Sequence, residues 1–293
     1  MSTRVLPKFS LLTPQSLTEA LEFAANLGGR ARFLAGGTDL LVKMKIGAIE
    51  PEILIGIKKI RELRSISYDR DSGLAIGALT TYRDLCKSPA ISASYAILHD
   101  VTYVFANEQL LNMGTVGGNI CNASPAGDLI PPFLALGASV ELMSPAGIRS
   151  VSLTDFFVAP GKTVLRPGEL LSRITVPALA ADVVGSFLRI TRTAEDLAKM
   201  SAAAVLAVRE GVFANVRLAL GAVAPTVIRL PTIEAFLEGR PADDNTIETA
   251  ASMVADLISP ITDLRSTATY RTNVAGIALK RAINQCISRR ANL

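Results

Sequence analysis

Two glycine-rich segments contain the residues of this sequence that are best suited to bind an anion. The first follows an apolar run and places Gly36 and Gly37 before Thr38 and Asp39. The second, residues 114–119, again combines adjacent glycines with a threonine and ends on an asparagine. Because glycine adopts positive φ and has no Cβ, successive backbone N–H groups can converge on an oxyanion. Two such segments could together hold a diphosphate, although two ordinary tight turns would have the same composition.

Neither segment matches a known dinucleotide-binding pattern. The spacing of Gly114, Gly117 and Gly118 differs from GxGxxG, and the Walker A pattern is absent. Asp128 lies a few residues downstream, directly after Gly127, at an expected helix start. Its carboxylate either caps that helix, which is the simpler interpretation, or accepts hydrogen bonds from a ribose or an adenine amine.

The residues that other kinds of catalysis require are largely missing. His99 is the single histidine, expected on a helix over residues 89–103, and the three cysteines are isolated from one another. No CxxC pair, histidine cluster or GxSxG motif occurs, so a metal site within this chain and a serine hydrolase are poorly supported. If the chain belongs to an enzyme, we expect a bound cofactor to perform the chemical reaction and no side chain to be catalytic. Unpaired cysteines fit a reducing, cytoplasmic location.

Composition excludes further classes of protein. The 293 residues are 49% hydrophobic and 19% charged, which is enough apolar material for a sizeable core and unlike a disordered chain. The net charge of +4 is dispersed, with dense basic spots only at residues 58–61 and 289–290. Without interleaved aromatic residues these spots predict solvated surface and no nucleic-acid groove. No apolar run reaches the length of a membrane span, and the N-terminus does not resemble a signal peptide.

The elements expected around the first glycine segment form a small α/β unit. Ser16 can cap a helix, with Glu19 three residues on, and Gly28 with Gly29 should stop it. Strands are expected at residues 31–35 and 53–57, on either side of the glycine segment. Residues 1–60 are therefore predicted to form one subdomain.

A second unit is predicted from residue 61 to 177, with strands at 74–79, 139–142, 149–152 and 170–176. After Pro177 strands are expected at 186–191, 202–208 and 216–221, followed by helices at 233–237, 244–257 and 269–289. Strands followed by helices predict an α+β domain over residues 178–293 with a three-stranded antiparallel sheet. Its last helix either packs on the sheet, the simpler interpretation, or docks a partner through Arg271, Lys280 and Arg281.

The combination of motifs resembles one known family. The sequences LAGGTDLL and NMGTVGGNICNASPAGDLIPPFLALGA are similar to those of the FAD-binding medium subunits of molybdenum hydroxylases, the xanthine dehydrogenase and carbon monoxide dehydrogenase family. The resemblance extends over nearly the whole chain and includes ILIGIKKIREL, GELLSRITVP and RSTATYR. It implies an α+β protein with a PCMH/vanillyl-alcohol-oxidase-type FAD-binding fold of two α/β subdomains, followed by the C-terminal domain.

The same resemblance implies a set of FAD-binding residues. They lie in the two glycine segments and at four further positions: Leu34, Ala35, Gly36, Gly37, Thr38, Asp39, Leu40, Leu41, Phe105, Thr115, Val116, Gly117, Gly118, Asn119, Asp128, Leu171 and Arg189. The family usually has lysine where this chain has Arg189, so the charge is kept while the geometry can differ. For Leu171, ordinary packing in a strand remains an equal alternative.

The resemblance further implies a division of labour between subunits. A large subunit would hold the molybdenum cofactor, a small subunit would carry two [2Fe-2S] clusters, and this chain would bind FAD non-covalently. Electrons would pass through the FAD to NAD+, oxygen, a quinone or another acceptor, in a dimer of heterotrimers. A stand-alone flavin oxidoreductase and a non-enzymatic nucleotide-binding module are the alternatives. The chain departs from the family at Leu111, where arginine is usual, and it lacks the cysteine-rich insertion of relatives with a [4Fe-4S] cluster.

Overall fold

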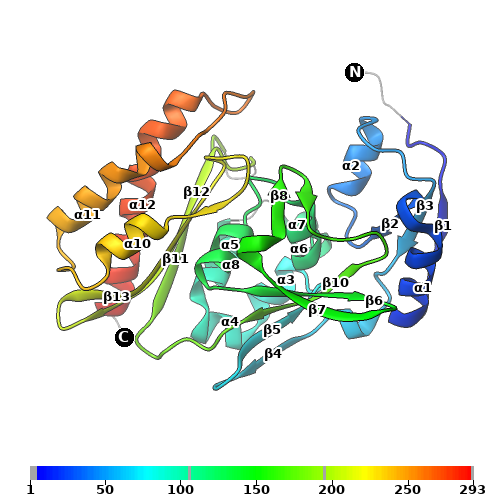
Figure 1. The fold of residues 1–293 in the computed structure, drawn as a ribbon, viewed down its shortest axis with the longest axis horizontal. Coiled ribbons are helices and arrows are strands. Elements are labelled where there is room, and N and C mark those ends of the chain that lie inside the picture. Colours follow the sequence, from blue (N-terminus) through cyan, green and yellow to red (C-terminus); the bar gives the residue numbers. More distant parts are fainter. Residues whose placement is uncertain (1–4, 105–106, 194–195, 292–293) are drawn as a thin grey trace.

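The computed structural model describes residues 5–104, 107–193 and 196–291. Figure 1 shows three units side by side along the long axis of the molecule. A small unit from the start of the chain lies at one end and the C-terminal part at the other. The middle of the chain fills the space between them.

The N-terminal unit is a parallel sheet with the strand order β1-β3-β2. Its elements are β1 (Ser10–Leu12), α1 (Leu17–Leu27), η1 (Gly28–Arg30), β2 (Ala31–Leu34), α2 (Leu40–Lys45) and β3 (Ile53–Gly56). As predicted, Ser16 caps α1 by accepting a hydrogen bond from the backbone N–H of Glu19. Because β2 and β3 are parallel, the loops that follow them leave from the same edge of the sheet.

The middle unit is built on an antiparallel sheet with the order β4-β5-β10-β6-β7. These strands are β4 (Ile66–Asp69), β5 (Gly73–Gly77), β6 (Ser139–Ser144), β7 (Gly147–Ser152) and β10 (Leu170–Val176). Three of the four predicted strands are confirmed closely, and the fourth, β5, is shorter than expected. The strand β4 was not predicted, because its residues 67–69 are exposed and give no apolar pattern.

The connections of the middle unit are mostly helical. They comprise η2 (Arg61–Leu63), α3 (Tyr82–Lys87), α4 (Pro89–Ser94), α5 (Ala96–Val104), α6 (Glu108–Met113), α7 (Val116–Asn122), α8 (Ile130–Ala135), α9 (Leu153–Phe156) and the strand pair β8 (Phe157–Ala159) and β9 (Lys162–Thr163). The single helix predicted over residues 89–103 is wrong, because the chain breaks at Tyr95. That side chain turns into the core and its hydroxyl donates to the Pro177 carbonyl at 3.1 Å.

The C-terminal unit is an antiparallel sheet covered by helices. Its elements are β11 (Val184–Ile190), β12 (Met200–Arg209), β13 (Val212–Gly221), β14 (Ile228–Arg229), α10 (Pro231–Leu237), α11 (Asp244–Ser252), η3 (Met253–Leu257) and α12 (Ala268–Ala291). The three predicted strands are present, but the sheet has the order β11-β12-β13-β14 and thus a fourth, two-residue strand. A strand this short has no detectable period, which is why the three-stranded prediction missed it.

The last helix packs on the sheet, as the simpler interpretation predicted. Ala275, Leu279 and Ile283 of α12 are fully buried with residues of β12 and β13. Arg271 does not belong to an outward basic face, because only 3% of it is exposed. It donates instead to the Ala222 carbonyl at 2.8 Å and to the loop that precedes α12. Within the described residues, no helix is long and apolar enough to cross a membrane.

The middle and C-terminal units are joined by charged groups. Asp100 of α5 accepts two hydrogen bonds from Arg289 of α12, at 2.6 and 2.7 Å, and one from the backbone N–H of Phe187 at 3.1 Å. Nearby, Gly185 of β11 packs so tightly that a Cβ there would lie 2.9 Å from the Cβ of Ile97. The two units therefore share one contiguous interface around β11.

Replacing Asp100 by Ala should lower the free energy of unfolding by about 2 to 4 kcal/mol, because Arg289 and the Phe187 N–H lose a partly buried partner. Urea denaturation of the full chain measures the change. Asp182→Ala is the matched control, since the Asp182–Arg209 pair has similar geometry but lies at a more exposed site. The control should cost less than about 1 kcal/mol. Equal losses in the two variants would contradict a role of Asp100 in joining the units.

Candidate functional site

The two predicted glycine segments lie against each other in the structure. Gly36 touches the second segment so closely that a Cβ there would be only 1.8 Å from the carbonyl oxygen of Met113. The side chain of Asn122 donates to Asp39 at 3.0 Å and accepts from the Lys43 ammonium at 2.5 Å. Glycine at position 36 is therefore required by a contact within the protein, which brings the two segments together.

The first segment offers hydrogen-bond donors that the protein does not use. In the described part of the chain, the backbone N–H groups of residues 36–39 donate to no acceptor. Gly37 has a φ of +75°, a conformation that most side chains avoid, so the backbone can turn sharply there. Consecutive free N–H groups on such a turn form a concave donor surface that suits an anionic oxygen.

The second segment is the start of a helix, so the alternative of a second ordinary tight turn does not hold. Thr115 is the N-cap of α7 and its hydroxyl accepts from the Gly118 N–H at 3.1 Å. The N–H groups of Val116 and Gly117 donate to the carbonyls of Thr80 and Ala78, both at 2.9 Å. These backbone donors are already satisfied, so they cannot also bind a ligand as the sequence suggested.

The second segment contributes close packing and one side chain instead. A Cβ on Gly117 would lie 2.6 Å from the Cβ of Ala78, so glycine lets α7 pack against the residues that follow β5. The side-chain oxygen Oδ1 of Asn119 is buried and has no hydrogen-bond partner in the described structure. A buried acceptor without a donor is costly, which marks Asn119 as a position where a ligand donor would be stabilising.

Asp128 is held by an ion pair and not by the helix that it was predicted to cap. Its Oδ2 accepts from Nη1 of Arg189 at 2.9 Å, and each of the two side chains is about 95% buried. The N-cap of α8 is Leu129, which has no side chain able to cap. The second oxygen, Oδ1, is buried without a partner in the described structure. Burial raises the pKa of Asp128 to about 6, while the charge of Arg189 acts in the opposite direction.

Tyr82, at the start of α3, connects these groups, and sequence reasoning missed it. Its ring packs against Gly114 and its side chain is fully buried. The pKa of its hydroxyl is raised well above the usual value by burial and then by the negative charges of Asp128 and Asp39, with Arg189 opposing them. The phenol is thus close to charged groups from the first segment, from the loop before α8 and from β11.

Lys43 and Asn122 were also missed, although the four-residue spacing of Asp39 and Lys43 was a usable signal on a helix. Desolvation raises the pKa of Asp39, and Lys43 followed by Asn122 lowers it. The residue is exposed overall, so this desolvation comes from atoms packed against the carboxyl group itself. Both flanking side chains fix the position of Asp39, which supports a loop-shaping role.

The other predicted residues fall into three groups. Leu34, Ala35, Leu40 and Leu41 are half-buried around the first segment, and a Cβ on Gly37 would contact the side chains of Leu34 and Leu41. Leu171 lies in β10, is 2% exposed and belongs to the core of the middle unit, as its packing interpretation states. Phe105 lies outside the described residues. The structure thus brings the two segments together and pairs Asp128 with Arg189, whereas Leu171 lies in the core.

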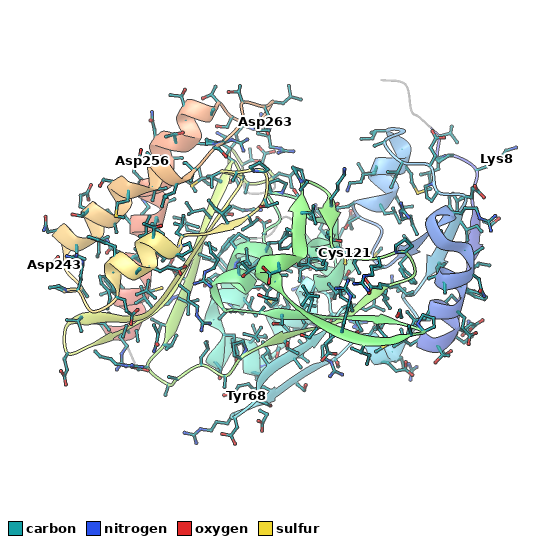
Figure 2. The ribbon with its side chains drawn as sticks, viewed as in Figure 1. Lys8, Tyr68, Cys121, Asp243, Asp256 and Asp263 are labelled. Carbon is teal, nitrogen blue, oxygen red and sulfur yellow. The ribbon has the colours of Figure 1, made fainter. Side chains whose placement is uncertain are left out.

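These groups fit a dinucleotide. The free N–H groups of residues 36–39 suit phosphate oxygens, and the unpartnered oxygens of Asn119 and Asp128 suit hydroxyl or amine donors. The thiol next to the second segment is not reactive: Cys121 of α7, in the middle of the molecule in Figure 2, has its pKa raised to about 12 by burial. A neutral thiol is a poor nucleophile toward a flavin ring.

Comparison with protein families decides the identity. Residues 7–179 match the model described as the FAD binding domain in molybdopterin dehydrogenase, and residues 186–286 match the CO dehydrogenase flavoprotein C-terminal domain. The chain belongs to the family of FAD-binding medium subunits of molybdenum hydroxylases. It is accordingly a flavin-dependent oxidoreductase subunit with the α+β fold that the sequence predicted.

Individual relatives of this medium subunit match almost from end to end. The carbon monoxide dehydrogenase medium chain of Hydrogenophaga pseudoflava is 34% identical over 97% of this chain and 98% of the relative. The glyceraldehyde dehydrogenase medium chain of Sulfolobus acidocaldarius is 32% identical over 95% and 98%, respectively. The solved structure of carbon monoxide dehydrogenase from Hydrogenophaga pseudoflava superposes with a TM-score of 0.94, covering 97% of this chain and 99% of that one at 35% identity.

The departure of this medium subunit at position 111 is an interior change. Leu111 lies on α6, is 8% exposed and packs in the core of the middle unit. Leucine therefore fills a buried site at the position where the family resemblance implied arginine.

The stability of the medium subunit should fall as pH rises from about 4 to 6, because burial raises the pKa of Asp128 from its usual 3.8 to about 6. The folded state then binds more protons than the unfolded state in this window, and the shift corresponds to about 3 kcal/mol. Urea denaturation at several pH values measures the slope. Asp128→Asn should remove it, whatever the change in absolute stability. An unchanged slope in the variant would assign the pH dependence to another group.

Proposed function

We propose that this chain binds FAD non-covalently and is the electron-transfer subunit of a molybdenum hydroxylase complex. The bound FAD would supply redox chemistry between the [2Fe-2S] clusters of a partner subunit and NAD+, oxygen, a quinone or another acceptor. The observation that carries the proposal is the concave set of unused N–H donors at residues 36–39 beside buried oxygens that lack partners. Without a ligand at this place, the buried oxygens of Asn119 and Asp128 lack a hydrogen-bond partner in the described structure.

Each part of the site has a role under this proposal. The N–H groups of Gly36, Gly37 and Thr38, with the hydroxyls of Thr38 and Thr115, bind the diphosphate. Asn119 and Asp128 accept from hydroxyl and amine groups of the ribityl and adenosine parts. The remaining described positions shape the walls: Leu34, Ala35, Asp39, Leu40, Leu41, Val116, Gly117 and Gly118. Leu171 would support them from the core of the middle unit, and Phe105 stays a contact predicted from the family resemblance alone.

The electrostatics of the site favour a bound anion. Arg189 neutralises Asp128, so this carboxylate does not repel the phosphates as an unpaired charge would. The Lys43 ammonium lies behind Asp39 through Asn122 and offsets its charge. The N–H groups of residues 36–39 then remain without acceptors, and their fixed dipoles stabilise negative charge near them.

The proposed partners follow from the relatives. Those matched over nearly their full lengths are medium chains of dehydrogenases, which supports a large molybdenum-cofactor subunit and a small iron–sulfur subunit here. We further propose a dimer of heterotrimers in the cytoplasm, since the three cysteines are free thiols. Subdomain boundaries near residues 60 and 177 are part of the same proposal. No observation favours a stand-alone flavoenzyme over this assembly.

Replacing Gly36 by Ala should abolish FAD binding, because the new Cβ would overlap the Met113 carbonyl and separate the two segments. The visible flavin absorbance per mole of purified chain measures FAD content. Gly29→Ala is the matched control: a Cβ there meets nothing within 4 Å, so FAD content should be unchanged.

Two outcomes would contradict this proposal. Wild-type chain that takes up no FAD on reconstitution would exclude FAD binding altogether. Full FAD content in the folded Gly36→Ala variant would show that the contact between the two segments does not form the site. Circular dichroism of the variant separates loss of FAD from loss of the fold.

A further inference from the structure

The loop between α7 and α8 brings two buried oxygen atoms without hydrogen-bond partners into one region. They are Oδ1 of Asp128 and Oδ1 of Asn119, and neither has a partner in the described structure. A Cβ on Gly127, the residue before Asp128, would lie 3.3 Å from the Asn119 oxygen. Two acceptors of the proposed FAD site are thus buried side by side, but only the carboxyl group of Asp128 can change its charge.

Arg189 determines which oxygen of Asp128 is left for a ligand. Its Nη1 donates to Oδ2 at 2.9 Å, and only 4% and 5% of the two side chains are exposed. Because the guanidinium group occupies Oδ2, a proton that binds to Asp128 is expected on Oδ1. The oxygen that faces no partner is therefore also the oxygen that takes up the proton. It accepts a hydrogen bond when Asp128 is ionised and donates one when Asp128 is neutral.

The groups around Asp128 favour a change of protonation at mildly acidic pH. Burial raises the pKa of Asp128 to about 6, although Arg189 of β11 favours the ionised form. Tyr82 of α3 is close to the same carboxyl group, and its own pKa is raised well above the usual value, so the phenol stays neutral. Asp39 also acts on Tyr82, but its charge is offset by Lys43. In the part of the chain that the structure describes, Arg189 is thus the charged group that acts directly on Asp128.

We propose that FAD binding is coupled to deprotonation of Asp128, so that the chain takes up FAD readily at neutral pH and poorly at acidic pH. The inference rests on the proposed function, in which Asp128 accepts from a hydroxyl or amine group of the adenosine part. A protonated Oδ1 would turn its own donor toward the donor of the ligand, and this hydrogen bond would be lost. The bound ligand stabilises the carboxylate in return, because a hydrogen bond to the charged form favours that form. At acidic pH, the proton of Asp128 is therefore released to solvent when FAD binds.

The test is a titration of the FAD-free full chain with FAD, followed by flavin fluorescence between about pH 5 and pH 8. The dissociation constant should be about tenfold larger at pH 5 than at pH 8, because pH 5 lies one unit below the pKa of about 6. Circular dichroism at each pH verifies that the chain is folded.

The variant Asp128→Asn imitates the protonated carboxyl group. Its amide oxygen can accept from Arg189, and its NH2 group then takes the place of Oδ1 as a donor. The variant should bind FAD as weakly as the wild type does at the acidic end of the titration, and its affinity should not change with pH. His99→Gln is the matched control, since His99 is the single histidine and histidine commonly titrates in this range. The control should keep the wild-type pH profile.

Calorimetry of the wild-type chain gives a second readout that needs no variant. At about pH 5, FAD binding should release roughly one proton for each FAD bound. The measured enthalpy should then differ between two buffers of different ionisation enthalpy. At about pH 8, where Asp128 is already ionised, this difference should vanish.

The inference would be overturned, with FAD binding intact, if the wild-type affinity did not vary with pH or if no proton were released at acidic pH. It would also fail if Asp128→Asn kept the wild-type profile, since another group would then titrate. A profile lost in His99→Gln would assign the pH dependence to His99 and contradict the role of Asp128. A wild-type chain that takes up no FAD at any pH would instead contradict the proposed function itself.

Discussion

The site depends on the close approach of Gly36 to the carbonyl of Met113. This contact joins two segments that lie far apart in the sequence and belong to different units of the fold. Any side chain at position 36 would hold them apart, so the backbone itself forms the joint. The hydrogen bonds of Asn122 to Asp39 and Lys43 then fix its orientation. The free N–H donors of residues 36–39 therefore form one concave surface, which is positioned by a contact between backbone atoms.

Local patterns predicted most of the fold. The Ser16 cap, the stop at Gly28 and the strands on either side of the first segment follow from turn and cap chemistry within a few residues. The same reasoning failed where tertiary packing decides. Tyr95 breaks an apparently continuous helix because its ring is buried, and β14 exists only because β13 offers an edge to pair with. Neither feature has a local sequence period.

The sequence predicted which residues form the candidate site, but not the role of each residue. Both glycine segments were recognisable, yet only the structure shows that the N–H groups of Val116 and Gly117 are used by the protein while those of residues 36–39 are free. Asp128 resembled a helix cap because its partner, Arg189, lies 61 positions away, in β11 of the C-terminal sheet. Tyr82 gave no local signal at all. Which backbone donors remain free cannot be deduced from sequence, because the fold determines the hydrogen-bond partner of each group.

The Asp128–Arg189 pair also constrains how this protein can evolve. The two family domains meet at residues 179 and 186, which suggests exchangeable modules. Yet the two buried charges lie on opposite sides of that boundary and are paired across it. A module transplanted without its counterpart would bury a lone charge, at a cost of about 3 to 5 kcal/mol. The boundary between the family models therefore does not separate independent units, because each half neutralises a buried charge of the other.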